Sequence, residues 1–288
     1  SFMESLSNIR EKVRLPLCIK VHPYLMDHRF QDKAVLPAVE AMEILAESTL
    51  AHLPEKSIHC IVDARFDKFL ILEKGILEIE AFNDLEVLDS GEVVSRLITR
   101  THSKKTMITR TREHAVLCFR DDPKTPDPLP LKFPETPDCH VSFETIYNTL
   151  VPFGPSYHNL KGEVSLSEKG AEAEVHAPPL RGLPIPLGSP FPMDAAFHAA
   201  CVWGQRYVGC VGFPVGFQIR RVLKATRPGI TYRATIIAKE TYSDRFLVDV
   251  RLSGPNRILY EEVQGLIMRD VTRGRMMPPR WFSKIGLS

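Results

Sequence analysis

The chain has 288 residues, of which 44% are hydrophobic and 25% charged, and its formal net charge is +2. This balance is typical of a globular protein with one large domain or two moderate ones, and it gives no reason to expect nucleic-acid binding. No stretch approaches the roughly 18 consecutive apolar residues of a transmembrane helix, so we expect no membrane partner. The commonest nucleotide-binding, serine-hydrolase and zinc-protease motifs are absent.

Six cysteines are scattered along the chain without a C-x-x-C pair or the spacing of metal ligands. Cys60 and Cys201 lie in apolar runs, where a free cysteine packs as a small hydrophobic residue. The first residues also lack the charged-then-apolar layout of a signal peptide. This pattern favours a reducing, cytoplasmic setting, and we expect no metal site.

The N-terminal half is expected to contain one long helix followed by strands. A short strand is expected near residues 15–22, and the helix begins at Pro37, since proline suits the first helical turn. In that helix Glu40, Glu43 and Glu47 form a polar stripe, while apolar residues line another face. Strand-like segments with alternating patterns follow near residues 57–72, 74–89, 91–102 and 105–120.

A proline-rich segment then separates the two halves. Its prolines forbid helix and central strand, so residues 121–140 are interpreted as an extended linker. The resulting organisation is an N-terminal unit over residues 1–120 and a C-terminal unit over residues 141–288, which together make one domain.

The C-terminal half repeats this order of elements. A short helical stretch is expected near residues 142–150, strands through 157–177, and a long helix over 192–207. That helix is apolar nearly all round, so it must be buried. Further strands are expected near residues 213–224, 230–240, 245–253 and 257–269. One long helix per half, wrapped by about four or five antiparallel strands, is an α+β layer architecture.

Three polar residues are candidates for chemistry. Asp194 and His198 are four residues apart on the buried second helix, so they share one face and reach each other. Asp194 could equally cap the helix N-terminus, with His198 as its hydrogen-bond partner. His28 precedes the first helix in a polar loop, where a solvated histidine is the ordinary interpretation. These residues alone leave both interpretations open.

Four motifs in order resemble those of polyketide synthase dehydratase domains. Residues 28–37 resemble the H-x-x-x-G-x-x-x-x-P signature, and residues 152–157 look like the Y-G-P-x-F motif. Residues 194–198 match D-x-x-x-Q/H, and residues 212–217 are similar to the proline-containing strand entry after the second helix. The resemblance covers residues 15 to 270 and implies a double hotdog: two tandem hotdog units, each with a long central helix wrapped by an antiparallel sheet.

The resemblance also implies an activity, the removal of water from a 3-hydroxyacyl thioester to give a trans-2-enoyl thioester. The substrate would be carried on the phosphopantetheine of an acyl carrier protein, with no other cofactor and no metal. His28 would be the base that takes the C2 proton, since neutral imidazole is basic near neutral pH. Asp194 would be the acid for the departing hydroxide, with His198 orienting it; burial raises a carboxyl pKa but a helix N-terminus opposes this.

The same motifs imply the substrate-binding residues. The thioester carbonyl is expected to face backbone N–H groups at the start of the Pro37 helix or around Gly154. Phe153 takes the place of the motif's tyrosine and lacks its hydroxyl. Asp32 takes the place of the glycine in the first motif, where a missing side chain would let backbone approach the substrate.

The expected partners are an acyl carrier protein, other domains of a polyketide or fatty acid synthase, and a second copy in a homodimer. Because carrier proteins are acidic as a class, two basic clusters are candidates for a docking face, although a solvated strand edge and a basic tail explain them as well. They are Arg220, Arg221, Lys224 and Arg227, and Arg269, Arg273, Arg275 and Arg280.

Three other functions stay open on the same fold. A product-template cyclase also uses a His and Asp pair but folds a long polyketone. A degenerate hotdog would serve as a structural or docking domain, and a thioesterase or hydratase of the wider superfamily is a further alternative. The depth and width of the pocket would separate the cyclase from the dehydratase.

Overall fold

The computed structural model describes residues 8–122, 136–182 and 185–286. In these residues one antiparallel sheet of 12 strands runs through the molecule in the order β1-β6-β7-β8-β4-β12-β15-β14-β13-β11-β10-β9. The N-terminal half supplies β1 (Ile9–Lys20), β4 (Cys60–Arg65), β6 (Glu78–Leu88), β7 (Val93–His102) and β8 (Thr109–Phe119). The C-terminal half supplies β9 (Cys139–Ser142), β10 (Leu160–Ser167), β11 (Gly170–His176), β12 (Phe213–Val222), β13 (Thr231–Thr241), β14 (Arg245–Ser253) and β15 (Leu259–Arg269).

The two halves of the sheet are joined by one antiparallel pair, β4 with β12. At this junction Gly216 lies opposite Arg65, and a Cβ atom on the glycine would come within 2.6 Å of the Ala64 carbonyl oxygen. Glycine therefore allows the two backbones to approach closely enough for the sheet to be continuous.

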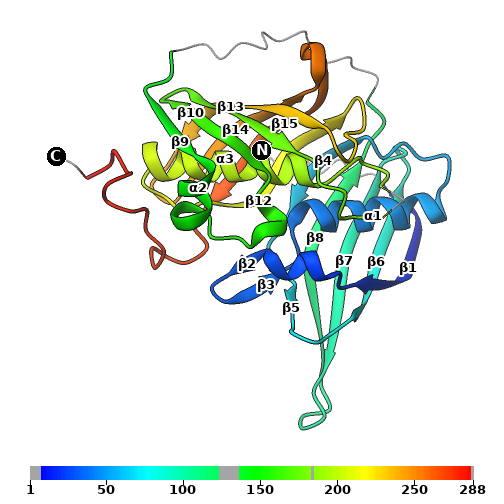
Figure 1. Ribbon diagram of the computed structural model, residues 1–288. Coiled ribbons are helices and arrows are strands. Elements are labelled where there is room, and N and C mark those ends of the chain that lie inside the picture. The colour runs from blue at the N-terminus through cyan, green and yellow to red at the C-terminus, as the bar shows by residue number, and fades with distance from the viewer. Residues whose placement is uncertain (1–7, 123–135, 183–184, 287–288) are drawn as a thin grey trace.

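One long helix packs against each half of the sheet, α1 (Ala38–His52) against the N-terminal strands and α3 (Phe191–Tyr207) against the C-terminal strands (Figure 1). This confirms the predicted pair of units, each with a central helix. Pro37 is the N-cap of α1, one residue before the helix starts. Almost every residue of α3 is buried, as its apolar composition predicts.

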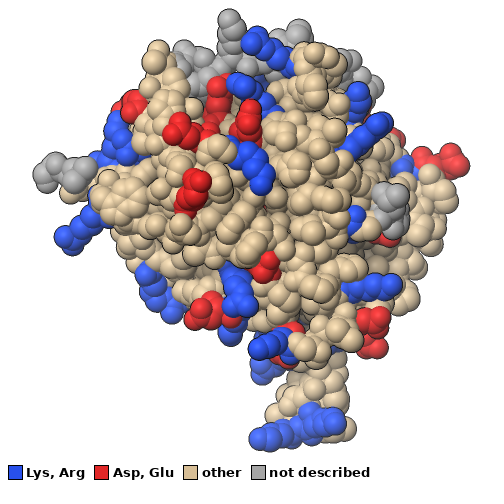
Figure 2. Space-filling view, in the orientation of Figure 1, with Lys and Arg blue, Asp and Glu red and all other residues tan. Residues whose placement is uncertain are grey.

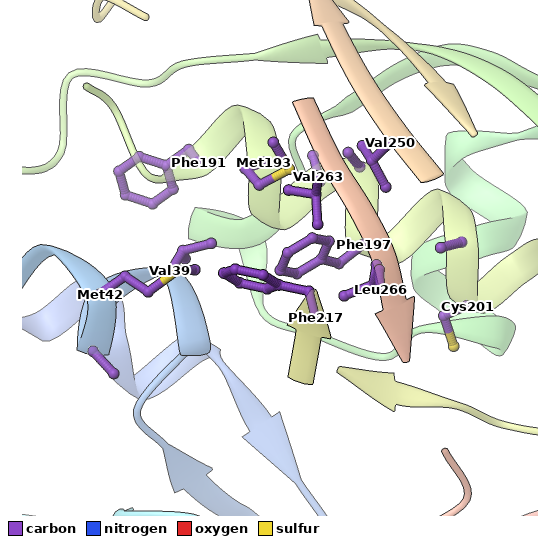
Figure 3. Packing of buried hydrophobic residues seen from close by; sticks show 14 of the residues in the cluster. Val39, Met42, Phe191, Met193, Phe197, Cys201, Phe217, Val250, Val263 and Leu266 are labelled. Atoms are coloured by element: carbon purple, nitrogen blue, oxygen red, sulfur yellow. The ribbon is translucent and has the colours of Figure 1, made fainter. Parts of the chain in front are cut away.

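The core is continuous between the halves. Val39 and Met42 of α1 face the rings of Phe197 and Phe217, which come from α3 and β12 (Figure 3). Met42 is fully buried and Phe197 is 3% exposed. Because the two helices share this core, residues that precede α1 can lie against residues of α3.

The predicted polar stripe on α1 is not a solvated face. Glu40 and Glu43 are 3% and 1% exposed, and only Glu47 reaches the surface. Glu40 accepts hydrogen bonds from the Tyr24 hydroxyl and the Arg181 side chain, and Glu43 accepts one from a backbone N–H. The helical periodicity locates the stripe correctly, but the segment before α3 covers it.

Several predicted boundaries also differ. β1 begins at Ile9 rather than near residue 15. The segment at 57–72 divides into β4 and the two-residue β5 (Ile71–Leu72), which joins β2 (Arg29–Phe30) and β3 (Lys33–Val35) in a small separate sheet. Residues 123–135 of the expected linker lie outside the described residues, and β9 begins within its last residues.

All six cysteines are free thiols. None of the described helices combines the length and the apolar character needed to cross a lipid bilayer.

Candidate functional site

His28 follows a short 3₁₀ helix, η1 (Pro23–Asp27), and directly precedes β2. Its backbone N–H donates to the Leu25 carbonyl, and its backbone carbonyl accepts from the Val35 N–H. Its ring Nδ1 lies 3.0 Å from the Val35 carbonyl oxygen. A carbonyl only accepts hydrogen bonds, so Nδ1 carries the hydrogen, and in the neutral ring Nε2 carries a free lone pair.

Nε2 of His28 faces the second candidate residue. His28 Nε2 lies 3.6 Å from Asp194 Oδ1, and the two side chains are 14% and 6% exposed. Asp194 sits in the first turn of α3, and its other oxygen lies 2.9 Å from Nε2 of His198. That contact is close, although it does not meet hydrogen-bond geometry. The expectation that His28 and Asp194 converge is confirmed.

The two histidines control the charge of Asp194. Burial by itself would raise the pKa of this carboxyl, but the electrostatic attraction of His198, followed by that of His28, outweighs burial. The pKa of Asp194 is therefore held well below its usual range, and the side chain is a carboxylate at rest.

Tyr147 is a residue of this site that the sequence analysis did not identify. It lies in the single π-helical turn η2 (Ile146–Leu150), and its hydroxyl accepts a hydrogen bond of 2.9 Å from the Leu160 N–H. The same hydroxyl lies 3.0 Å from His198 Nδ1. Burial raises the pKa of Tyr147 well above its ordinary value, so the hydroxyl keeps its proton and donates it to Nδ1.

Phe153 lies between the two histidines. Its ring centroid is 4.4 Å from that of His28 and 4.9 Å from that of His198. The residue lines the same cavity as His28, Asp194 and His198. It therefore supplies an apolar wall where the related motif has a tyrosine.

Backbone N–H groups are expected to face the thioester carbonyl at two places, around Gly154 and at the start of α1, and the structure differs between them. The N–H of Gly154 donates to the Asp27 carbonyl, so it is not free to face a substrate as predicted. A Cβ atom on Gly154 would lie 2.4 Å from the Asp27 side chain, which explains the glycine by close packing. At the start of α1, after Pro37, the N–H groups of Ala38 and Val39 have no acceptor among the described residues.

The cavity formed by these residues has a volume of about 120 Å³ and is mostly apolar. Its walls include Ala38, Leu97, Leu150, Phe197 and Phe213. Cys201 also lines it, but burial raises the pKa of this thiol to about 11, so it is a poor nucleophile at neutral pH. No group of three His, Cys, Asp or Glu side chains in the described part of the chain could hold a metal ion.

Asp32 does not enter the cavity. Gln31 and Asp32 form the tight turn between β2 and β3, with φ of 46° and 65°, and the Asp32 side chain is exposed. The glycine of the related motif is explained by this left-handed turn conformation rather than by approach to substrate. No ion pair with Lys33 or Arg29 forms among the described residues.

Two members of the predicted docking cluster after α3 are not available at the surface, whereas Lys224 and Arg227 are exposed. Arg220 is 1% exposed and its guanidinium lies 2.9 Å from Glu261. Arg221 is paired with Asp122 and Glu262 at 2.6 and 2.8 Å. These two cations stabilise the sheet interior and are not free to meet an acidic partner.

Comparison with known proteins identifies the fold. No protein-family model matches the chain. In an alignment 207 residues long that covers 69% of its length, the chain is 25% identical to one of the subunits of a polyunsaturated fatty acid synthase from Thraustochytrium sp.. The chain spans only 7% of the length of that relative.

Solved structures with the same architecture are dehydratase domains of polyketide synthases. One from Brevibacillus brevis, of the trans-AT type, has a TM-score of 0.70 at 16% identity, and one of a mycocerosic acid synthase-like synthase has 0.69 at 17%; in both comparisons 90% of this chain and 94% of the other are covered. The dehydratase domain of the curacin CurF module has a TM-score of 0.69 at 14% identity over 92% of this chain and 95% of that domain. The chain therefore has the double hotdog fold of polyketide synthase dehydratase domains.

Proposed function

We propose that this protein removes water from a 3-hydroxyacyl thioester to give the trans-2-enoyl thioester. The observation that carries the proposal is the approach of His28 Nε2 to Asp194 Oδ1, 3.6 Å apart, in the wall of a mostly apolar cavity. Adjacent carbons of a substrate between these two groups would be within reach of both a base and an acid.

In the proposed reaction, His28 Nε2 takes the proton from C2, and the electron pair of that C–H bond forms the C2–C3 double bond. The C3–O bond breaks, and the departing hydroxide takes a proton from Asp194 and leaves as water. His28 ends protonated and Asp194 ends as a carboxylate, so a proton must return from one to the other before the next turnover.

The charge state of Asp194 at rest fits this cycle. A protonated His28 beside ionised Asp194 holds the same number of protons as a neutral His28 beside protonated Asp194. Asp194 is ionised while His28 stays in contact with it. A substrate that separates them and excludes water favours the second form, which has no buried charges. Asp194 would thus take up its proton when the substrate binds.

The start of α1 supports binding of the thioester carbonyl. Ala38 lines the cavity, and its N–H and that of Val39 have no acceptor among the described residues. We propose that these two donors, at the positive end of the helix dipole, hold the carbonyl oxygen as negative charge develops on it.

The substrate is proposed to arrive on the phosphopantetheine of an acyl carrier protein, and the chain to work beside other synthase domains. The support is the partial match to a fatty acid synthase and the likeness to dehydratase domains. The cavity of about 120 Å³ is smaller than the roughly 300–1,000 Å³ of pockets that hold drug-sized ligands, so it favours a short acyl unit over the long polyketone of a cyclase.

The experiment is turnover of a 3-hydroxybutyryl N-acetylcysteamine thioester without added cofactor. The parent should interconvert hydroxyacyl and enoyl forms, and His28→Ala and Asp194→Asn should each lower kcat/KM by about 10²–10⁴-fold. His140→Ala, which removes an exposed histidine on β9, is the matched control and should keep the parent rate. Folded variants of His28 and Asp194 with parent activity would refute the proposed roles.

A further inference from the structure

The β7–β8 hairpin extends well beyond the rest of the sheet (Figure 1). Every residue from 100 to 112 is exposed. In this region the strands pair only with each other, as His102 does with Thr109 and Thr101 with Arg110. We call residues 100–112 the ribbon. Because it adds nothing to the core, its composition is free to serve contacts with another molecule.

The ribbon is strongly basic. It contains five Lys or Arg residues and no Asp or Glu, namely Arg100, Lys104, Lys105, Arg110 and Arg112. Its tip is blue in the space-filling view of the charged residues (Figure 2). No described carboxylate lies within ion-pair distance of Lys104, Lys105, Arg110 or Arg112, so their charges are not neutralised within the described part of the chain.

The two faces of the ribbon differ in what their cations contact. Residues paired across an antiparallel sheet lie on the same face, and the faces alternate along a strand. One face carries Arg100 and His102, and the Arg100 guanidinium packs over the Phe82 ring at 4.9 Å. The other face carries Arg110 opposite Thr101 and Arg112 opposite Thr99.

The Arg110 and Arg112 face leads to the cavity. The Thr99 hydroxyl lies 2.7 Å from Nε2 of His114, and His114 lines the cavity. His114 is the extra residue of a β-bulge, since Leu97 pairs with Ala115 and Ile98 with Glu113. The bulge directs the His114 ring toward the cavity.

Lys68 and Arg29 lie between this face of the ribbon and the cavity. Nδ1 of His114 lies 3.0 Å from the Lys68 carbonyl oxygen, and Lys68 and Arg29 both line the cavity. Burial, with smaller effects from the nearby charges of Arg112 and Lys68, lowers the pKa of His114. The ring is therefore neutral, and it fixes the Lys68 segment beside the base of the ribbon.

We infer that the face formed by Arg110, Arg112 and Lys68 is the docking surface for an acidic acyl carrier protein, placed so that the carrier's pantetheine arm enters the cavity beside it. The inference rests on the proposed function, because only a carrier-borne substrate requires a docking surface here. Charge complementarity selects the partner, because cations without an ion pair among the described residues fit an acidic surface. In the cluster after α3, by contrast, Arg220 and Arg221 are already paired with Glu261, Glu262 and Asp122.

The test is binding of a fluorescently labelled 3-hydroxybutyryl acyl carrier protein of the fatty acid synthase type, measured by anisotropy at two salt concentrations. The parent should bind, and binding should weaken with added salt. The double variant R110E/R112E should bind at least about tenfold more weakly and with a smaller salt dependence. Arg257→Glu, at an exposed turn before β15, is the charge-matched control and should bind as the parent does.

Turnover of the small N-acetylcysteamine thioester separates this inference from the proposed function. R110E/R112E should lose activity on the carrier-bound substrate while keeping the parent rate on the small thioester. Equal losses on both substrates, equal binding by parent and double variant, or no binding by the parent would overturn the docking surface. Failure of the parent on the small thioester would instead overturn the dehydratase proposal.

Discussion

The Tyr147 hydroxyl lies 3.0 Å from Nδ1 of His198, on the side of the ring away from Asp194. Because that hydroxyl already accepts from the Leu160 N–H, its own hydrogen points at Nδ1. Nδ1 is then the acceptor nitrogen of His198, and Nε2 carries the hydrogen toward Asp194. Tyr147 thus sets the tautomer of the residue that holds the proposed acid.

Replacing Tyr147 with phenylalanine should lower kcat on the short thioester by about tenfold with little change in KM, since Tyr147 positions the acid through His198 and does not line the cavity. Nitrogen NMR of His198 should show a mixture of tautomers in the variant. Tyr242→Phe, which removes an exposed hydroxyl bonded to Glu240, is the control. A single unchanged His198 tautomer in Tyr147→Phe would refute this role.

His198→Gln should move the acidic limb of the pH profile. The attraction of His198 is the largest influence that lowers the pKa of Asp194 against burial. A glutamine amide is a weaker donor than an imidazole N–H, so the pKa of Asp194 should rise, and the fall of kcat/KM at low pH should begin at a higher pH than in the parent. Steady-state rates between pH 4 and 9 test this, and an acidic limb at the parent position would contradict it.

Asp32→Gly should leave activity unchanged, because the side chain is exposed on the β2–β3 turn and does not line the cavity. The left-handed backbone at φ 65° favours glycine, so the free energy of unfolding should rise by about 0.5 kcal/mol. Urea denaturation and turnover measure the two effects. A large loss of activity in the folded variant would show that Asp32 takes part in the site.

Glu43 should make stability depend on pH. Burial raises the pKa of Glu43 from 4.5 to about 8, with Arg220 opposing. Between those values the folded protein binds more protons than the unfolded chain, so the free energy of unfolding should fall as pH rises from 5 to 8. Glu43→Gln should reduce that fall in the free energy of unfolding by on the order of 1–3 kcal/mol. Glu47→Gln, at the more exposed end of the polar stripe, is the control and should leave the fall unchanged. Equal pH dependence in parent and Glu43→Gln would contradict this.

The sequence predicts the parts of this fold that depend on local pattern. The periodicity of α1 and the uniform apolar character of α3 locate both helices to within a residue or two. The sequence also predicts that His28 and Asp194 lie close together, because the order of the motifs carries long-range information that local periodicity lacks.

What the sequence could not predict depends on contacts between distant segments. The polar stripe on α1 is buried by the Arg181 segment, and Arg220 is buried against Glu261, although both patterns are typical of a solvated face. Tyr147 has no pattern of its own, since its role arises only when η2 packs beside α3. The net charge of +2 likewise conceals the basic ribbon, because opposite charges elsewhere cancel it.

The central claim is that His28 and Asp194 act as one active site, and a double-mutant cycle tests it most directly. The measurement is kcat/KM on the short thioester for His28→Ala, Asp194→Asn and the double variant. If the two residues act in one step, the double variant should be no slower than the slower single variant, because either loss alone already removes the shared step. Losses that multiply in the double variant would show that the two residues act independently and would contradict the single-site account.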